Sequence, residues 1–182
     1  PPCAKALVEH RLGRVVVATM DPNPQVAGRG LRMISEAGIA VTKGVLEKEA
    51  YDANIGFMTR MTTGRPWVRL KCASTLDGRT AFPDGRSQWI TGSDARHDTQ
   101  YWRGCAGAIV TGIGTVKADN PRMTVRLPDQ VRFPIRVIVD AKLETPTTAH
   151  ILEGGNTLIV TASTDEQKAQ ALKATGAEIW HL

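Results

Sequence analysis

A glycine turn followed by a carboxylate has the clearest chemistry in this sequence. The short apolar run from Ala108 to Thr111 predicts a strand, and it breaks into Gly112-Ile-Gly-Thr115. Glycines let backbone N–H groups approach an anion, and a helix from about Thr115, with that threonine as its cap, would add partial positive charge. This order of strand, turn and helix suits a phosphate group. Alone it is weak evidence, because such turns are also common for packing reasons.

A wider series of motifs is far more specific. It contains Lys71-x-Ala-x-Thr-Leu-Asp-Gly-Arg79, Ser87-x-Trp-Ile-Thr91, Gly112-x-Gly-Thr115, Asp119-Asn-Pro121 and Thr124-Val-Arg126. With these motifs the sequence resembles the reductase domain of the bifunctional riboflavin-biosynthesis deaminase/reductases, a domain similar in fold to dihydrofolate reductase. The resemblance covers nearly the whole chain.

The resemblance implies a reaction and a set of site residues. The family reduces the ribosyl group of a deaminated pyrimidine 5′-phosphate to a ribityl chain, with hydride from NADPH. Catalytic roles fall to Lys71 and Asp119, a cation and a carboxylate that could polarise and reprotonate the opening sugar. The positions that contact the substrate are Ser87, Arg103, Met123 and Arg126. The positions that contact the cofactor are Ala73, Trp89, Gly112, Gly114, Thr115, Asp119 and Ala141.

Each of these residues also has a purely structural interpretation. Trp89 could be a core tryptophan, Arg103 a solvated arginine at the end of a helix, and Asp119 a turn former before Asn-Pro. Ala141 stands where the family often has a hydroxyl residue, so only a backbone contact is expected there. As a set spaced along strand ends, the residues favour a site, because ligands of open α/β sheets gather outside the carboxyl ends of strands.

The first residues resemble the end of the family's zinc deaminase domain. That domain holds Zn²⁺ with one histidine and two thiolates, and Cys3 after Pro1-Pro2 matches the second thiolate position. The His-x-Glu motif and the first cysteine of the pattern are absent from these 182 residues. This sequence alone therefore cannot assemble a deaminase site, and without the resemblance a cysteine near a terminus is more often unliganded. The Asp21-Pro-Asn-Pro24 stretch is as well explained by a structural turn as by the family's pocket border.

Alternating strand and helix patterns predict an α/β fold in two parts. The resemblance implies that residues 1–64 are the C-terminal part of a cytidine-deaminase-like αβα domain. It also implies that residues 65–182 are the N-terminal part of a dihydrofolate-reductase-like domain that continues beyond this piece of a longer protein, and the alternation predicts for it a mostly parallel sheet with helices on both faces. Pro66 supports the boundary, since it disfavours a helix through Arg65.

The expected elements follow from apolar spacing and turn residues. Strands are expected at residues 13–19, 39–45, 67–77, 106–111, 135–140, 157–160 and 178–181. Helices are expected at residues 31–37, 46–61, 93–103, from about 115, and 164–175. The helix at 46–61 should bury Leu46, Ala50, Ile55, Phe57, Met58 and Met61. Glu153-Gly-Gly155 resembles the family's pyrophosphate turn, but it precedes a strand, so a loop or hairpin is favoured and the real turn is expected beyond Leu182.

Composition narrows the class of protein. The formal net charge is +5, but the basic residues are dispersed and do not alternate with aromatic residues, which argues against a nucleic-acid partner. No apolar run approaches the roughly 20 residues of a membrane span. Three cysteines without a Cys-x-x-Cys favour a reducing cytoplasm. The resemblance further implies a homo-oligomer, dimer or tetramer, and Zn²⁺ in the intact protein.

Two alternative functions stay open at this point. A pterin or folate-type NADPH reductase could use the same fold, although the pair Arg103 and Arg126 favours a phosphorylated substrate. A basic, non-catalytic nucleic-acid-binding domain would need clustered cations and stacking aromatics.

Overall fold

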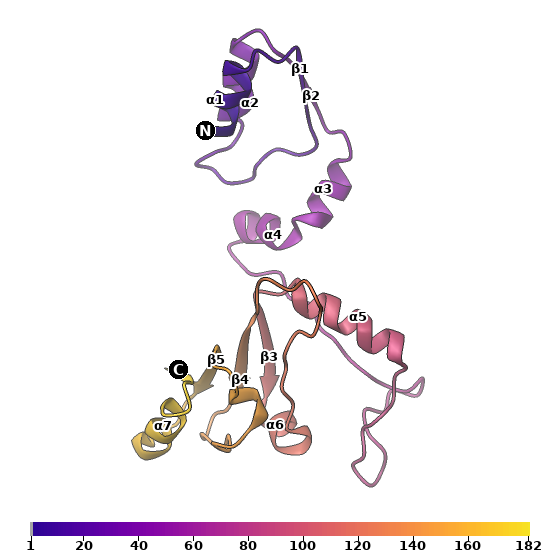
Figure 1. Ribbon diagram of the computed structural model, residues 1–182, viewed down its shortest axis with the longest axis vertical. Coiled ribbons are helices and arrows are strands. Elements are labelled where there is room, and N and C mark those ends of the chain that lie inside the picture. The colour runs from indigo at the N-terminus through magenta and orange to yellow at the C-terminus, as the bar shows by residue number, and fades with distance from the viewer. Residues whose placement is uncertain (1) are drawn as a thin grey trace. The chain divides into compact units, whose positions relative to one another are not determined.

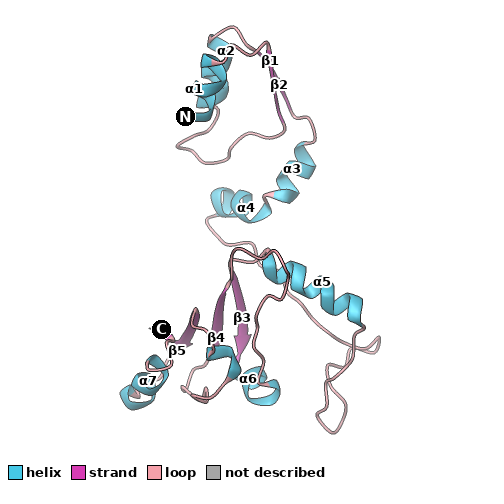
Figure 2. Ribbon diagram, in the orientation of Figure 1, coloured by secondary structure: helices cyan, strands magenta, loops and turns pink. Residues whose placement is uncertain are grey.

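The structure, a computed structural model, describes residues 2–182 and divides into two compact units between Leu70 and Lys71 (Figure 1). Pro1, from the Pro1-Pro2-Cys3 stretch, lies outside the described residues. Both units contain parallel strands joined through helices (Figure 2), so the predicted α/β class is confirmed. Within residues 2–182, no helix has the length and apolar character needed to cross a membrane.

The first unit begins with a helix that the sequence did not predict. Its elements are α1 (Pro2–Glu9), β1 (Arg14–Val17), α2 (Arg29–Glu36), β2 (Ala40–Lys43), α3 (Glu47–Ala53) and α4 (Ile55–Thr63). Strands β1 and β2 pair in parallel, and α1 packs against α2. The small core contains Ala4 from α1, Ile34 from α2 and Ile39 beside β2. A helix as short as α1 is stabilised mainly by packing, here against α2. The sequence of residues 2–9 alone therefore indicated a helix only weakly.

The helix predicted at residues 46–61 is broken in two. Asn54 has a φ of −118° between α3 and α4, and its side-chain Nδ2 donates to the carbonyl of Ala50 at 2.9 Å. Of the predicted inner face, Met58 is buried, whereas Leu46 and Phe57 are exposed. That face was wrong because a single helical period no longer applies across the break. Gly64, with a φ of 72°, then ends α4 in the left-handed conformation that glycine adopts easily.

The second unit is built on a four-stranded parallel sheet in the order β3-β4-β5-β6. The strands are β3 (Ala108–Gly112), β4 (Ile135–Val139), β5 (Thr157–Thr161) and β6 (Glu178–His181). The helices are α5 (Ser93–Gly104), α6 (Ile113–Asp119) and α7 (Glu166–Lys173), with a 3-10 helix, η1 (His150–Leu152), before β5. Helix α6 packs against β3, and α7 packs against β6.

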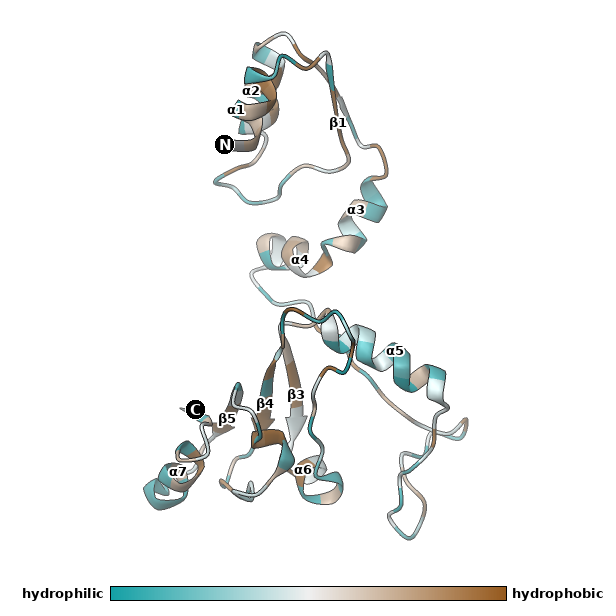
Figure 3. Ribbon diagram, viewed as in Figure 1, coloured by the Kyte–Doolittle hydropathy of each residue, from teal (hydrophilic) through white to brown (hydrophobic). Residues whose placement is uncertain are grey.

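One face of this sheet carries the core of the unit. Ile138 and Ile159 point to that face and are fully buried against Val116 of α6 and Leu172 of α7. On the opposite face Val110 is 62% exposed and Trp180 is 55% exposed, although the strands are hydrophobic (Figure 3). The prediction of helices on both faces is therefore wrong for residues 2–182, where the helices that pack on the sheet, α6 and α7, cover one face.

The strand predicted for Trp67–Asp77 does not form. The segment is extended and largely exposed, with the apolar side chains of Val68, Leu70 and Leu76 in solvent. Apolar and β-branched residues favour a strand, but a strand also needs a neighbour for its backbone hydrogen bonds. Within the described part of the chain this segment pairs with no strand. A turn follows at Gly78, since the Gly78 N–H donates to the Thr75 carbonyl at 2.9 Å and Gly78 has a φ of 80°.

Helix α7 begins with a side-chain cap. Asp165 is the N-cap, and its Oδ1 accepts a hydrogen bond from the Lys168 N–H at 3.0 Å. This backbone hydrogen bond lowers the pKa of the Asp165 carboxyl below its ordinary 3.8. A lowered pKa in the folded state means that the ionised cap stabilises the fold above the ordinary pKa. This contribution disappears as the pH falls through the folded value.

We therefore expect the stability effect of Asp165→Ala to depend on pH. Near neutral pH the variant should melt at a lower temperature than the wild type, and the gap should shrink below pH 3.8. Asp165→Asn is the control, because its amide oxygen can still cap the helix but does not titrate. Thermal denaturation of the three proteins across this range is the measurement. A gap between wild type and Asp165→Ala that is constant with pH would contradict the carboxylate cap.

Candidate functional site

The carboxyl ends of β3 and β4 bring part of the predicted site to one edge of the sheet. Gly112 ends β3, Gly114 and Thr115 follow in α6, and Ala141 lies two residues beyond β4. Because Gly112 pairs with Val139 in the parallel register, both strands end at the same edge. Parallel topology thus gathers residues predicted to contact the cofactor where open α/β sheets bind ligands.

The helix after this turn starts earlier than the sequence predicted. Helix α6 begins at Ile113, and Gly112 is its N-cap with no side-chain hydrogen bond. Thr115 therefore lies within the first turn, and the prediction that its hydroxyl caps the helix is wrong. The glycine leaves the strand with an extended backbone at φ −92°, so the chain turns into the helix before it reaches the threonine.

The two glycines of the turn face open space. A Cβ built on Gly112 or on Gly114 would meet no described atom within 4 Å, apart from its chain neighbours and, for Gly114, the backbone of its own helix. Neither glycine has a positive φ, so the backbone conformation does not require glycine at either position. Packing within residues 2–182 and backbone geometry therefore leave these positions free for larger side chains. The space beside the strand end fits the close approach of a nucleotide phosphate.

Asp119 and Ser87 meet although they come from distant parts of the sequence. Asp119 is the last residue of α6, and Ser87 belongs to the loop before α5. The Ser87 hydroxyl Oγ lies 3.4 Å from Asp119 Oδ1, at the long end of hydrogen-bond distance. The Asp119 side chain is exposed, so its second oxygen remains accessible. A predicted proton-transfer residue thus lies beside a predicted substrate contact.

Trp89 is presented to solvent and supported by an arginine. Its side chain is 69% exposed, which excludes the core interpretation. The Arg96 guanidinium lies 4.3 Å from the centre of the Trp89 ring, and Arg96 Nη1 also donates to the Thr91 carbonyl at 2.6 Å. A cation over the ring face restricts the orientation of the indole. One face of an oriented aromatic ring suits stacking against a flat ligand group.

Arg103 is half-buried in the second unit and contacts the segment that carries Met123. Its Nη1 donates to the Thr124 carbonyl at 3.2 Å, and its Nη2 lies 3.7 Å from Met123 Sδ. The interpretation of Arg103 as a solvated arginine is therefore wrong. Burial first, and then the positive charge of Arg126, lower the pKa of Arg103 below its usual value. Arg103 and Met123, which are both predicted to contact the substrate, therefore also contact each other.

Arg126 belongs to the segment that Arg103 contacts, and its positive charge acts on Arg103. The Arg126 N–H donates to Oε1 of Gln100 at 3.0 Å, so α5 holds the same segment through both Gln100 and Arg103. Within residues 2–182, neither arginine forms a recorded ion pair with a carboxylate. Adjacent cations repel each other unless an anion lies between them, and guanidinium groups match phosphate oxygens well.

The structure does not bring every predicted site residue into contact with another one. Lys71 and Ala73 lie in the extended segment after Leu70, and no recorded contact within residues 2–182 joins Lys71 to Asp119. Cys3 is an exposed free cysteine in the first turn of α1. Within the described residues, no group of three possible metal-ligating side chains surrounds it or any other point. The Glu153-Gly-Gly155 stretch forms a loop before β5, as predicted, with Gly155 at φ 69°.

Sequence reasoning missed three residues that hold the predicted site residues or their loops in place. Arg96 orients Trp89, Gln100 holds the backbone of Arg126, and Arg136 contacts the loop after α6. The spacing of Gln100 and Arg103 on one helix face was an available signal. A lone arginine inside the apolar strand β4 was a second signal, because such a charge is rarely buried without partners.

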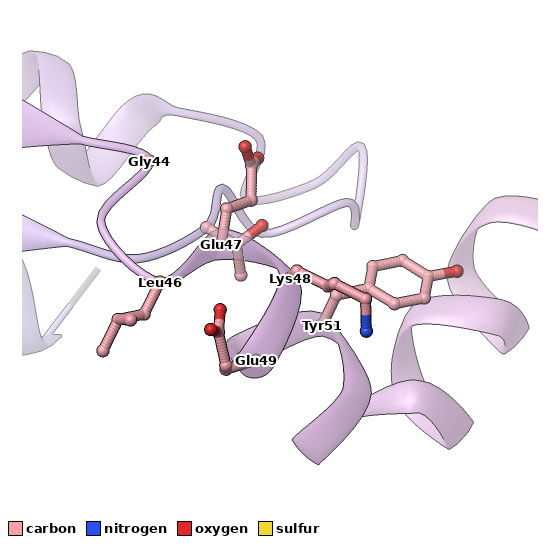
Figure 4. Close-up of a pocket in the computed structure, with 7 residues that line it drawn as sticks. Gly44, Leu46, Glu47, Lys48, Glu49 and Tyr51 are labelled. Atoms are coloured by element: carbon pink, nitrogen blue, oxygen red, sulfur yellow. The ribbon is translucent and has the colours of Figure 1, made fainter.

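The first unit has a depression of its own, but its side chains do not converge. It is lined by Thr19, Gly44, Leu46, Glu47, Lys48, Glu49 and Tyr51, and its volume is about 680 Å³. In Figure 4 the side chains of Leu46, Glu49 and Tyr51 point in different directions. None of the residues predicted to do chemistry lies there.

Comparisons with known proteins identify relatives along the whole chain. The model of the RibD C-terminal domain matches residues 66–182. The chain is 45% identical over 185 residues to riboflavin biosynthesis protein RibD of Bacillus amyloliquefaciens, covering all of this chain and 50% of the relative. It is 42% identical to RibD of Escherichia coli K12, covering 92% of this chain and 49% of the relative. The chain thus spans about half the length of the curated relatives it matches.

Solved structures give the same result for the fold. One form of Acinetobacter baumannii RibD matches with a TM-score of 0.90 and 45% identity, over 100% of this chain and 51% of that chain. The Thermotoga maritima diaminohydroxyphosphoribosylaminopyrimidine deaminase/5-amino-6-(5-phosphoribosylamino)uracil reductase matches with a TM-score of 0.84 and 33% identity, over 98% and 56%. The dihydrofolate-reductase-like fold of the RibD C-terminal domain agrees with the predicted class. The chain belongs to the RibD family, and its residues 66–182 match the C-terminal domain of that family.

Proposed function

We propose that the protein to which this chain belongs reduces the ribosyl group of 5-amino-6-(5-phosphoribosylamino)uracil to a ribityl chain, with NADPH as reductant. The observation that carries the proposal is the contact of the half-buried Arg103 with Met123 and the Thr124 carbonyl, in the segment that also carries Arg126. This pair of arginines fits the 5′-phosphate of this substrate. An unconjugated pterin has no anionic group to engage this pair, and the comparison with dihydrofolate below tests the folate-type alternative.

The open edge of the sheet fits the cofactor. The space beside Gly112 and Gly114 suits the phosphates of NADPH, and the exposed ring of Trp89 suits a flat group. The residues proposed to hold the cofactor are Ala73, Trp89, Gly112, Gly114, Thr115, Asp119 and the backbone of Ala141. When bound, NADPH supplies the hydride for the reduction.

We assign the proton chemistry to Lys71 and Asp119. As the sugar ring opens, its ring oxygen gains a proton, and the carbon it leaves becomes the hydride acceptor. Asp119 is exposed beside the Ser87 hydroxyl, which supports a position for it at the ribosyl end of the substrate. Lys71 would polarise the same end, and the exposed segment that carries it leaves its ammonium group accessible.

The test is steady-state NADPH oxidation by the full-length protein. Three substrates are compared: the ribosylaminopyrimidine phosphate, its dephosphorylated form and dihydrofolate. We expect fast oxidation with the first, much slower oxidation with the second and none above background with the third. Preferential reduction of dihydrofolate would replace this proposal by the pterin-reductase alternative.

We further propose that residues 1–64 are the C-terminal part of a zinc deaminase domain, that residues 65–182 are the N-terminal part of the reductase domain, and that Cys3 is a zinc ligand. The support is the match of Cys3 to the family's second thiolate position and its exposure on α1. The proposed compartment is the cytoplasm. The proposed assembly is a homo-oligomer, a dimer or tetramer, without nucleic-acid or membrane partners.

The zinc proposal predicts a separation of the two activities. Full-length Cys3→Ser should contain less zinc than the wild type and lose deaminase activity, because a hydroxyl is a poor substitute for a thiolate ligand. Reductase activity should largely persist. Metal analysis and both assays are the measurements, with Cys72→Ser as a matched control from the second unit. Equal zinc content in wild type and Cys3→Ser would mean that Cys3 is not a ligand.

A further inference from the structure

Arg136 is a buried cation at the second position of the apolar strand β4. It is 6% exposed, and its guanidinium donates to backbone carbonyls of two separate loops. Nη2 donates to the Glu153 carbonyl at 2.9 Å and also to the Gly155 carbonyl, and Nη1 lies 3.4 Å from the Arg122 carbonyl. Burial lowers the pKa of Arg136, and the charge of Glu153 acts in the opposite direction. Burying a charge costs free energy unless the charge is hydrogen-bonded, and the three carbonyl contacts compensate for this cost. The position of Arg136 under these two loops therefore suggests a specific role.

The first of these loops, residues 120–123, is tied to the second in two further ways. The Asn120 side-chain Oδ1 accepts a hydrogen bond from the His150 N–H at 2.8 Å. The guanidinium of Arg122 pairs with the Glu153 carboxylate, next to the carbonyl that Arg136 contacts. Arg136 therefore lies where the loop after α6 contacts the segment before β5, and we call this contact region the joint.

This joint holds an unusual backbone conformation at Met123. Met123 has a φ of 52°, in the left-handed region that non-glycine residues rarely adopt, whereas Asn120, at φ 41°, is the C-cap of α6, where asparagine adopts this region readily. Such conformations persist where the surrounding structure fixes them. The backbone at Met123 determines whether its sulfur can lie against Arg103, and Asp119 directly precedes Asn120. The loop therefore connects Arg136 to two residues assigned to the substrate site.

We propose that Arg136 is a positioning residue for the substrate site: by holding the Arg122 carbonyl against the Glu153–Gly155 loop, it sets the conformation of residues 120–123 and hence the place of Met123 against Arg103. This inference rests on the proposed function for its kinetic consequence. A purely structural role would be filled equally well by an apolar side chain of similar length, which would pack in β4 but leave the loop carbonyls without their donor.

The test compares Arg136→Met, Arg136→Lys and the wild type as full-length proteins. Methionine keeps the length but removes the charge and the donors, whereas lysine keeps the charge and can reach fewer carbonyls. We expect Arg136→Met to raise the KM for the phosphorylated substrate roughly fivefold to tenfold, less than the hundredfold that a misplacement of about 1 Å can cost. The KM for NADPH should change less than about twofold, and Arg136→Lys should recover part of the loss. Arg132→Met, which changes an exposed arginine before β4, is the matched control.

Amide hydrogen exchange of residues 120–126 provides a readout that does not depend on the reaction. Exchange in this segment should be faster in Arg136→Met than in the wild type, with a smaller increase in Arg136→Lys. An unchanged substrate KM together with unchanged exchange in a folded Arg136 variant would overturn the inference. Should Arg136→Met not fold, Arg136→Lys decides by the same two measurements. A wild-type protein that does not reduce the substrate would refute the proposed function, while the exchange comparison would still decide whether Arg136 holds the loop.

Discussion

Replacing Arg126 or Arg103 by alanine should lower kcat/KM for the phosphorylated substrate by about tenfold to hundredfold. Each change removes a charge-assisted interaction with the phosphate worth roughly 1.5–3 kcal/mol, and each 1.4 kcal/mol corresponds to a factor of about ten. Arg103 should show the larger effect, because its guanidinium also contacts the Thr124 carbonyl and Met123. Arg126 is exposed, so its loss should affect binding more than folding.

The dephosphorylated substrate identifies the group that the arginines recognise. Wild type should discriminate strongly between the two substrates, and Arg126→Ala should discriminate much less. Arg126→Lys should recover only part of the loss, because lysine keeps the charge but not the planar fork. Arg132→Ala, at an exposed arginine outside the site, controls for a general change in surface charge. If Arg126→Ala discriminates between the substrates as well as the wild type, Arg126 is only a surface charge.

The second large effect is expected at Gly114. Gly114→Val should weaken NADPH binding at least about tenfold, because the added side chain would fill the space next to the strand end that we assign to the cofactor phosphates. The same change should not destabilise the fold, since no described atom outside the chain neighbours and the backbone of α6 lies within 4 Å of an added Cβ. Gly114→Ala is the sharper variant. It should stabilise α6 by up to about 1 kcal/mol, as alanine replaces a helical glycine, and still weaken NADPH binding.

Gly107 offers a matched control for this experiment. It lies just before β3, at the opposite end of the same strand, and a Cβ there would also meet no described atom within 4 Å. Gly107→Val should therefore leave NADPH affinity unchanged. Affinity is measured by fluorescence titration and stability by thermal denaturation. Equal NADPH affinity in Gly114→Val and the wild type would remove the phosphate turn from the proposed site.

The parallel elements could be predicted from local sequence because local patterns and tertiary structure agree there. Strand β6 begins and ends as predicted, since Gly176 separates it from the preceding helix and Ile179 and Trp180 give the short run its apolar centre. The segment 67–77 carries an equally strong local signal but lacks a partner strand in residues 2–182. The break at Asn54 was not predicted, because the apolar spacing of residues 46–61 continues across it.

The candidate site likewise has features that the sequence predicts and features that it does not. Gly112, Gly114 and Ala141 could be placed at one edge from the strand order alone, because parallel strands end together. The contacts between Ser87 and Asp119, and between Arg103 and Met123, join distant segments and were expected only from the resemblance to the family. Arg136 and Gln100 were missed, since their roles depend on backbone groups that no local pattern specifies.

The order of the strands in the second unit also bears on how this sheet is made. Among the described residues, the spatial order β3-β4-β5-β6 is the order of synthesis, so each strand pairs with the one translated just before it. In a sheet whose strand order differs from the sequence order, a central strand can be completed only after a later strand has been made. Among the described strands of this sheet, none depends on a later one in this way. Loop closures between successive strands are short compared with the whole chain, which favours rapid pairing. The sheet can therefore extend one strand at a time from β3 as the chain leaves the ribosome.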